Sequence, residues 1–211
     1  MAPTYDDILK ANATKNDKIR KTPIVYSPTF SQLSESKVYL KSEFQQKTGA
    51  FKIRGAYYKI QNLSDEEKQK GVIAASAGNH GQGVAYAANA ENIPCTIVMP
   101  KNASPAKVSA TKGYGADVIL DGTNYDEAST KAKELAKETG AILIHAFDDP
   151  EIIAGQGVIG LEILEQIPDV EEVYVPIGGG GLAAGVLIAI KTTHPNVKVI
   201  GVQSRSFPSM Y

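Results

Sequence analysis

The chain has 211 residues, enough for one large domain or two small ones. Charged side chains make up 21% of it, 22 basic and 23 acidic, so it lacks the basic excess that is typical of nucleic-acid-binding proteins. Its first residues, MAPTYDDILK, lack the apolar core of a secretory signal, and no apolar run approaches the roughly 20 residues that span a bilayer. We therefore expect neither a nucleic-acid partner nor a membrane partner.

A single cysteine, Cys95, leaves no possibility of an intramolecular disulfide or a multi-cysteine metal site. It lies in the apolar run CTIVMP, where we expect it to be a small core residue. A cytoplasmic location follows as the default expectation.

Short apolar runs rich in Val and Ile alternate with helical patterns along most of the chain. Their composition is typical of strands buried on both faces of a parallel sheet. Between them, Ser64–Glu67 is a capping box that opens a short helix ending at Gly71, and residues 124–140 have the polar cap and terminal glycine of a longer helix. The alternation predicts an α/β fold of the doubly wound type. The runs are VYLKSEF (38–44), VIAAS (72–76), CTIVMP (95–100), DVILD (117–121), AILIHAF (141–147), VYVPI (173–177) and VKVIGVQ (197–203).

The end of the chain departs from this pattern. Only SRSFPSMY follows the last predicted strand, which leaves nothing to cover it. We therefore expect the chain to be truncated at its C-terminus, as a part of a longer protein.

Three segments indicate chemistry, and the first is Lys47-Thr48-Gly49-Ala50-Phe51-Lys52-Ile53-Arg54-Gly55-Ala56. Lys52 lies between two apolar residues near the expected start of a helix. A lysine removed from water has a lowered pKa, and its amine can then form a Schiff base. A single lysine in such a setting is more often a surface residue with a buried stem.

The second segment, Ser76-Ala77-Gly78-Asn79-His80-Gly81-Gln82-Gly83, follows the strand 72–76 and precedes the helix VAYAANAEN. A polar, glycine-rich turn at this place offers free N–H groups to an anion such as a substrate carboxylate. Ser76, Asn79 and His80 add side-chain donors. The alternative is a turn in which Ser76 or Asn79 only satisfies backbone groups.

The third segment places four consecutive glycines, Gly178 to Gly181, and Leu182 between the strand 173–177 and an apolar helix. Glycines allow positive φ angles and close backbone approach, and a nest of N–H groups at a helix start binds phosphate. A merely flexible turn is the less favoured alternative.

Two G-x-G-x-x-G-like patterns point toward a dinucleotide, but neither is well placed. The pattern Gly155 to Gly160 lies inside an expected helix, where its glycines permit close packing instead. The pattern that begins at Gly178 follows a strand, yet the next strand ends at Gln203, where a ribose-binding acid is required. The three histidines, His80, His145 and His194, have no metal-ligand spacing, so we predict no metal site.

Taken together, the three segments in this order resemble the fold-type-II pyridoxal-phosphate enzymes (tryptophan synthase β-like), over essentially the whole chain. The resemblance is closest to threonine dehydratases, also called threonine ammonia-lyases, with serine racemases next; the segment 147–164 and VIGVQS (199–204) also resemble that subgroup. It implies two doubly wound domains, a large cofactor domain of residues 1–47 and 148–211, incomplete here, and a small one of residues 48–147. It also implies a homodimer or homotetramer.

The resemblance also implies roles for individual residues. Lys52 would hold pyridoxal 5′-phosphate and act as the catalytic base, with Phe51 beside the pyridine ring. Asn79 would bind the phenolic oxygen of the ring, and Gly178, Gly179, Gly180, Gly181 and Leu182 would bind the phosphate. The substrate carboxylate would lie in the loop formed by Ser76, Ala77, Gly78, Asn79 and His80.

The implied activity is dehydration and deamination of L-threonine to 2-oxobutanoate and ammonia, and of L-serine to pyruvate. Serine racemases have a serine at the position of Ala77, and racemisation needs an acid or base on each face of the cofactor. Ala77 has no titratable proton and so favours elimination. A serine racemase and a truncated, non-catalytic binding module stay as alternatives.

Overall fold

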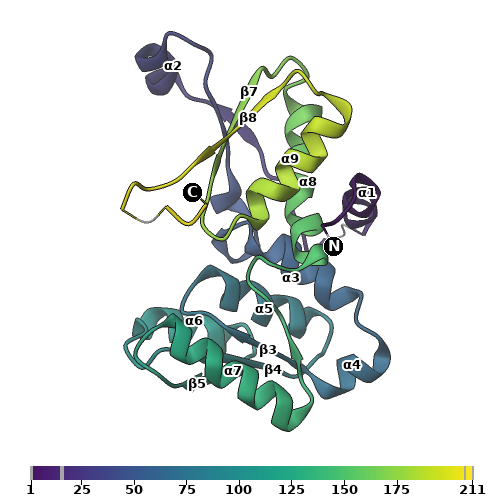
Figure 1. The fold of residues 1–211 in the computed structure, drawn as a ribbon, viewed down its shortest axis with the longest axis vertical. Coiled ribbons are helices and arrows are strands. Elements are labelled where there is room, and N and C mark those ends of the chain that lie inside the picture. Colours follow the sequence, from purple (N-terminus) through teal and green to yellow (C-terminus); the bar gives the residue numbers. More distant parts are fainter. Residues whose placement is uncertain (1, 15–16, 207, 211) are drawn as a thin grey trace.

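The structure is a computed structural model, and it describes residues 2–14, 17–206 and 208–210. Two units lie one above the other in Figure 1, with helix α3 (Lys52–Gln61) between them. The first, which we call the four-stranded unit, extends from α4 (Asp65–Lys70) to β6 (Ile142–Leu143). The second, the α8–α9 unit, combines residues 5–14 and 17–45 with residues 150–202. The two units thus alternate along the chain, and α3 packs on both α5 and α8. The predicted domain boundaries stay a prediction.

The four-stranded unit contains a parallel sheet in the order β5-β4-β3-β6. Side chains of β3 alternate between two cores: Val72 and Ala74 face the core shared with α3 and α5, whereas Ile73 and Ala75 face the core shared with α7. The expected burial of these strands on both faces is therefore confirmed at the centre of the sheet. The remaining elements are β3 (Val72–Ala75), α5 (Asn79–Ala90), β4 (Cys95–Met99), α6 (Pro105–Gly113), β5 (Asp117–Leu120) and α7 (Tyr125–Thr139).

The predicted ends of α4 and α7 are confirmed. Ser64 and Glu67 form a reciprocal capping box at the start of α4, and Gly71 is its C-cap. Asn124 caps α7 by accepting from the backbone N–H of Glu127, and Gly140 ends it with a left-handed backbone. Cys95 is buried in the core, as predicted, and burial raises its pKa to about 12.

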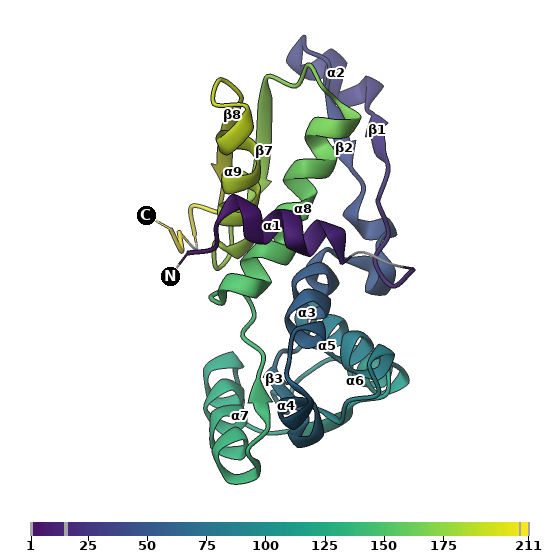
Figure 2. The same cartoon turned by 90° about the vertical axis from the view of Figure 1, so that its right-hand side faces the viewer.

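The α8–α9 unit is built around a pair of helices, α8 (Pro150–Gln166) and α9 (Gly181–Thr193). Figure 2 shows α1 (Tyr5–Ala13) crossing this pair from the outside. Two parallel strands, β7 (Glu172–Pro176) and β8 (Lys198–Val202), form a separate sheet. The other elements are β1 (Ile24–Tyr26), α2 (Pro28–Ser34), β2 (Tyr39–Lys41) and the 3₁₀ turns η1 (Glu43–Gln45) and η2 (Lys47–Gly49).

One strand prediction was wrong in kind. Residues 38–44 were expected to form a buried parallel strand, but β2 covers only Tyr39–Lys41 and pairs antiparallel with β1. Tyr39 and Leu40 are exposed, and the chain turns at Ser42 into η1. The apolar composition of this run reflects a two-stranded ribbon that leaves one face uncovered.

The glycines inside α8 permit close helix packing, as predicted. A Cβ on Gly155 would come within 2.6 Å of the Cα of Gly55 in α3, and one on Gly157 within 2.9 Å of the carbonyl oxygen of Gly185 in α9. Both values are far below van der Waals contact, so only glycine fits. Helix α8 therefore holds α3 on one side and α9 on the other.

Candidate active site

Lys52 is the first residue of α3, and its side chain is half-buried. Its Nζ donates a hydrogen bond to the carbonyl oxygen of Ala146 at 2.7 Å and lies 5.5 Å from the centroid of the Phe51 ring. Burial lowers the pKa of this amine from its ordinary value, and the carbonyl that accepts from it is neutral. The amine is thus more available as a base or nucleophile than a surface lysine.

The loop after β3 carries the predicted carboxylate site. Helix α5 begins at Asn79, earlier than the helix expected from the sequence, and Gly78 occupies its N-cap position without a side chain to cap it. Ser76 is buried, and its Oγ accepts from the N–H of Gly78 at 3.1 Å. The hydroxyl proton of Ser76 is left to donate, and the first N–H groups of α5 have no acceptor within the helix, so both can bind an anion.

His80 lies in the first turn of α5 and is buried. Its Nε2 lies 3.0 Å from the carbonyl oxygen of Ile144. Burial lowers its pKa to about 4, the Ile144 carbonyl opposes this, and the nearby Lys52 charge lowers the pKa further. The ring is therefore neutral, with its hydrogen on Nε2, because only that atom faces an acceptor. The side chain has no second hydrogen to donate, so a carboxylate here would use the backbone N–H of His80.

The glycine turn lies between β7 and α9. Gly180 has φ +84° and is the N-cap of α9, where no described side chain caps the helix. A Cβ on Gly179 would collide with the ring of Phe147, and one on Gly181 would lie 2.6 Å from the carbonyl oxygen of Phe147. The turn thus needs glycine for its backbone conformation and for close approach, and it offers free N–H groups at a helix start.

A short segment, residues 144–149, connects these parts; Figure 1 shows it running from the four-stranded unit to α8. The carbonyl of Ile144 accepts from His80, the carbonyl of Ala146 accepts from Lys52, and Phe147 contacts the glycine turn. His145 shapes the segment because its Nδ1 accepts from the N–H groups of Phe147 and Asp148, at 3.3 and 2.8 Å. Lysine, histidine and glycine turn therefore gather on one stretch of backbone.

The sequence did not point to this segment as a site. A backbone carbonyl has no residue signature, and the apolar run 141–147 predicted a strand that in fact ends at Leu143. Of the other predicted residues, Ala77 is half-buried, Asn79 and Gly178 are exposed, and Phe51 and Leu182 pack against the core of the α8–α9 unit. Among the described residues, no three His, Cys, Asp or Glu side chains gather as a metal site would require.

No described helix is long and apolar enough to cross a membrane. The arrangement thus contains an amine of lowered pKa, that of Lys52, which binds the same segment that contacts the glycine turn. The glycine turn can bind a phosphate, and the start of α5 can bind a second anion. Such a set can hold a phosphorylated aldehyde and an amino acid side by side.

The chain is similar in sequence and in overall fold to proteins that have names and solved structures. A protein of Thermotoga maritima named L-threonine ammonia-lyase is 54% identical over 207 residues, which are 98% of this chain and 52% of its own length. The solved structure of the processed form of threonine deaminase isoform 2 from Solanum lycopersicum is 42% identical, with a TM-score of 0.91 over 95% of this chain and 58% of that one. Maize serine racemase is 39% identical, with a TM-score of 0.92 over 95% and 61%.

The chain spans about half the length of the curated relatives it matches. The family described as pyridoxal-phosphate dependent enzyme matches residues 15–211, almost the whole chain. The chain therefore belongs to the family of pyridoxal-phosphate-dependent enzymes.

Proposed function

We propose that the protein to which this chain belongs is a threonine ammonia-lyase, which converts L-threonine to 2-oxobutanoate and ammonia and L-serine to pyruvate. The observation that supports this most directly is the amine of Lys52, half-buried and bound to Ala146, next to the residue that contacts the glycine turn. Relatives named L-threonine ammonia-lyase are 54% and 47% identical to the chain.

The residues present fit pyridoxal phosphate. The glycine turn has free N–H groups and a left-handed residue at a helix start, which suits the phosphate. The Lys52 amine is desolvated, which suits an aldehyde. The Nδ1 of His80 is buried, carries no hydrogen and has no hydrogen-bond partner among the described residues, so it can accept a hydrogen bond from a donor group of a bound molecule. When bound, pyridoxal phosphate supplies an electron sink for charge left on the substrate Cα.

In this proposal, Gly178, Gly179, Gly180, Gly181 and Leu182 bind the phosphate, and Phe51 and Asn79 contact the ring. Backbone N–H groups of residues 77–80 and the hydroxyl of Ser76 bind the substrate carboxylate. Lys52 removes the Cα proton, and its lowered pKa raises the fraction of unprotonated amine for this step. The Ala146 carbonyl holds the Lys52 amine on the face of the substrate from which the proton is removed. This hydrogen bond breaks when the amine moves to react.

Serine racemase is the second candidate, since a protein of that name is among the similar structures. We favour elimination because Ala77 has no proton to deliver to the second face of the substrate. A non-catalytic binding module is the remaining alternative. A homodimer or homotetramer and a cytoplasmic location also remain proposals.

The test is incubation of the purified protein with pyridoxal phosphate and then L-threonine. We expect the absorbance of a lysine-bound cofactor to form, and 2-oxobutanoate and ammonia to appear in equal amounts. Lys52→Ala should abolish both signals, whereas Lys112→Ala, which removes an exposed lysine of α6, should leave them unchanged. Retained turnover in Lys52→Ala would remove Lys52 from its role.

The alternatives predict different results. D-serine as the main product from L-serine would favour a racemase. Intact folding of the protein without the cofactor absorbance would favour a binding module.

A further inference from the structure

A second group of charged side chains lies where α3 meets α8 and takes no part in the proposed reaction. We call it the Arg54 cluster; it consists of Arg54, Glu43, Glu162 and Lys41. Arg54 is 3% exposed and Glu162 is 1% exposed. Burying charges is costly unless each is paired and fully hydrogen-bonded, so the geometry of such a group is tightly specified.

The guanidinium of Arg54 binds two carboxylates, each through two hydrogen bonds. Its Nε and Nη2 donate to Glu43 at 2.8 and 2.9 Å, and its Nη1 and Nη2 donate to Glu162 at 2.9 and 3.0 Å. Bidentate pairs of this type fix orientation as well as distance. Lys41 donates to the second oxygen of Glu162 at 2.7 Å.

The cluster joins the start of α3 to α8, because Arg54 lies two residues after Lys52 and Glu162 lies in the last turns of α8. Helix α8 also contacts the other parts of the site. It begins directly after the segment that includes Ala146, and its Gly157 packs against Gly185 of α9, the helix that starts at the glycine turn. The position of α3 on α8 therefore sets the position of Lys52 relative to the turn.

The start of α3 is held by apolar packing of Ile53 and by the close approach of Gly55 to Gly155, and among the described residues Arg54 adds its ion pairs. Phe51 occupies the N-cap position and makes no side-chain cap hydrogen bond, so the first turn lacks the usual capping interaction. The opposite end of α3 has its own contact with α8, from Lys59 to Asp149 and Glu151, and that end lies two turns away from the amine.

We propose that Arg54 is a positioning residue, which through Glu43 and Glu162 holds the first turn of α3 on α8 and so places the Lys52 amine at the Ala146 carbonyl. The importance of that amine rests on the proposed function. Among the described residues, the hydrogen bonds of Arg54 run to Glu43, Glu162, Arg20 and Thr22 and not to Ala146 or the glycine turn, so its effect on the amine is transmitted through the backbone of α3.

Arg54→Lys tests the proposal because it keeps the charge and removes the planar fork that binds two carboxylates. In the cofactor-free full chain, the rate at which an amine reagent labels Lys52 is followed against pH by mass spectrometry. We expect the midpoint for Lys52 to rise toward that of an exposed lysine, because the displaced amine is better hydrated. In the loaded enzyme, we expect kcat for L-threonine to fall roughly tenfold to a hundredfold, with a much smaller change in KM.

Ile60→Ala is the matched control. Ile60 is fully buried in the same helix, so this variant loses stability through a cavity and leaves the charges in place. We expect it to lower the thermal midpoint while the labelling midpoint of Lys52 and kcat stay unchanged. Glu43→Gln is the second variant if Arg54→Lys does not fold, because Glu43 is only partly buried; we expect the same two changes in smaller size.

The proposal is overturned if the folded Arg54 or Glu43 variant matches Ile60→Ala in both readouts. The cluster would then have only a structural role. The proposed function can fail separately: if the labelling midpoint shifts as expected but the unaltered protein neither takes up pyridoxal phosphate nor consumes L-threonine, positioning stands and the ammonia-lyase assignment does not.

Discussion

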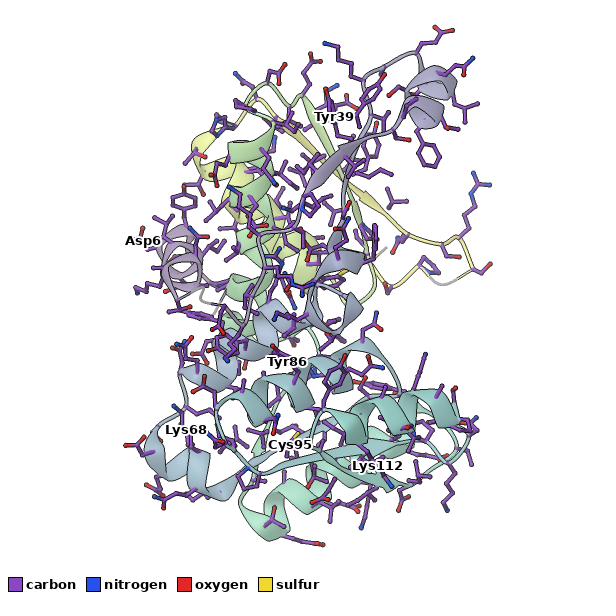
Figure 3. The ribbon with its side chains drawn as sticks, turned by 180° about the vertical axis from the view of Figure 1, so that it is seen from behind. Asp6, Tyr39, Lys68, Tyr86, Cys95 and Lys112 are labelled. Atoms are coloured by element: carbon purple, nitrogen blue, oxygen red, sulfur yellow. The ribbon has the colours of Figure 1, made fainter. Side chains whose placement is uncertain are left out.

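The two units bury their strands to very different extents, although the strands look alike in the sequence. All four residues of β3 are buried, and β4 has four buried residues among its five. In β7 only Val173 and Val175 are buried, and Tyr174 remains 64% exposed. Figure 3 shows the contrast, with Cys95 inside the four-stranded unit and Tyr39 on the β1–β2 ribbon of the α8–α9 unit.

The two units therefore obtain their stability from different contacts. A parallel sheet covered on both faces draws it from buried strands. A two-stranded sheet with one open face is weak by itself. The α8–α9 unit therefore depends on its helix contacts, through Gly157 and Gly185, and on the Arg54 cluster.

The largest expected effect is on the four-stranded unit. Ile97 in β4 is fully buried, so Ile97→Ala should lower the free energy of unfolding by about 2–5 kcal/mol through lost burial and a cavity. Val202 ends β8 and is 51% exposed, so Val202→Ala should change it by no more than about 0.5 kcal/mol. Urea denaturation measures both. Equal losses of stability in the two variants would contradict the difference in strand burial between the two units, since they would mean that β8 is covered in solution.

The sequence predicted the four-stranded unit better than the α8–α9 unit, and the reason is physical. Its strands lie between helices whose ends are marked by Ser64, Gly71, Asn124 and Gly140, so local signals and burial agree. The prediction for residues 38–44 failed because an apolar run has no information about how many layers will cover it. Helices α1, α2 and α6 were not predicted at all.

Some parts of the candidate site could be predicted from the sequence and others could not. Lys52 and the glycine turn stand out because desolvated lysine and consecutive glycines each have a chemical use. The carbonyls of Ile144 and Ala146 could not be found, because any residue supplies a carbonyl. The partners of Arg54 were equally hidden, since Glu43 and Glu162 are distant in the sequence and no local pattern links them.

The pH dependence of stability should separate the two units. His80, in the four-stranded unit, has its pKa lowered from 6.5 to about 4 in the folded state, chiefly by burial. Between pH 6.5 and 4, the unfolded chain therefore binds a proton at His80 and the folded chain does not. The free energy of unfolding falls as the pH drops through this range. A shift of this size corresponds to about 3 kcal/mol.

Glu162, in the α8–α9 unit, titrates in a lower window. Arg54 and Lys41 outweigh its burial and lower its pKa from 4.5 to about 2. The carboxylate stabilises the folded chain above pH 4.5, and this contribution of about 3 kcal/mol is lost as the pH falls toward 2. Urea midpoints measured from pH 7 to pH 2 should lose their upper slope in His80→Gln and their lower slope in Glu162→Gln. Unchanged slopes in either variant would show that other groups control acid unfolding of that unit.

The smallest expected effect concerns the glycine turn, which joins the exposed sheet of the α8–α9 unit to its helix pair. Gly180 has φ +84°, a conformation that costs an L residue roughly 1–2 kcal/mol, so Gly180→Ala should destabilise by about that amount. Its Cβ would also displace the end of the Met210 side chain, a flexible group that can move.

Gly178→Ala meets no atom within 4 Å and should change stability by less than about 0.5 kcal/mol. Because the fold is then unchanged, any loss of affinity of Gly178→Ala for pyridoxal phosphate would come from the added methyl group between the backbone and the phosphate. The affinity is measured by titration of the cofactor absorbance. If it is unchanged, Gly178 does not bind the phosphate, and the phosphate site consists of Gly179–Leu182, where the turn meets Phe147 and the start of α9.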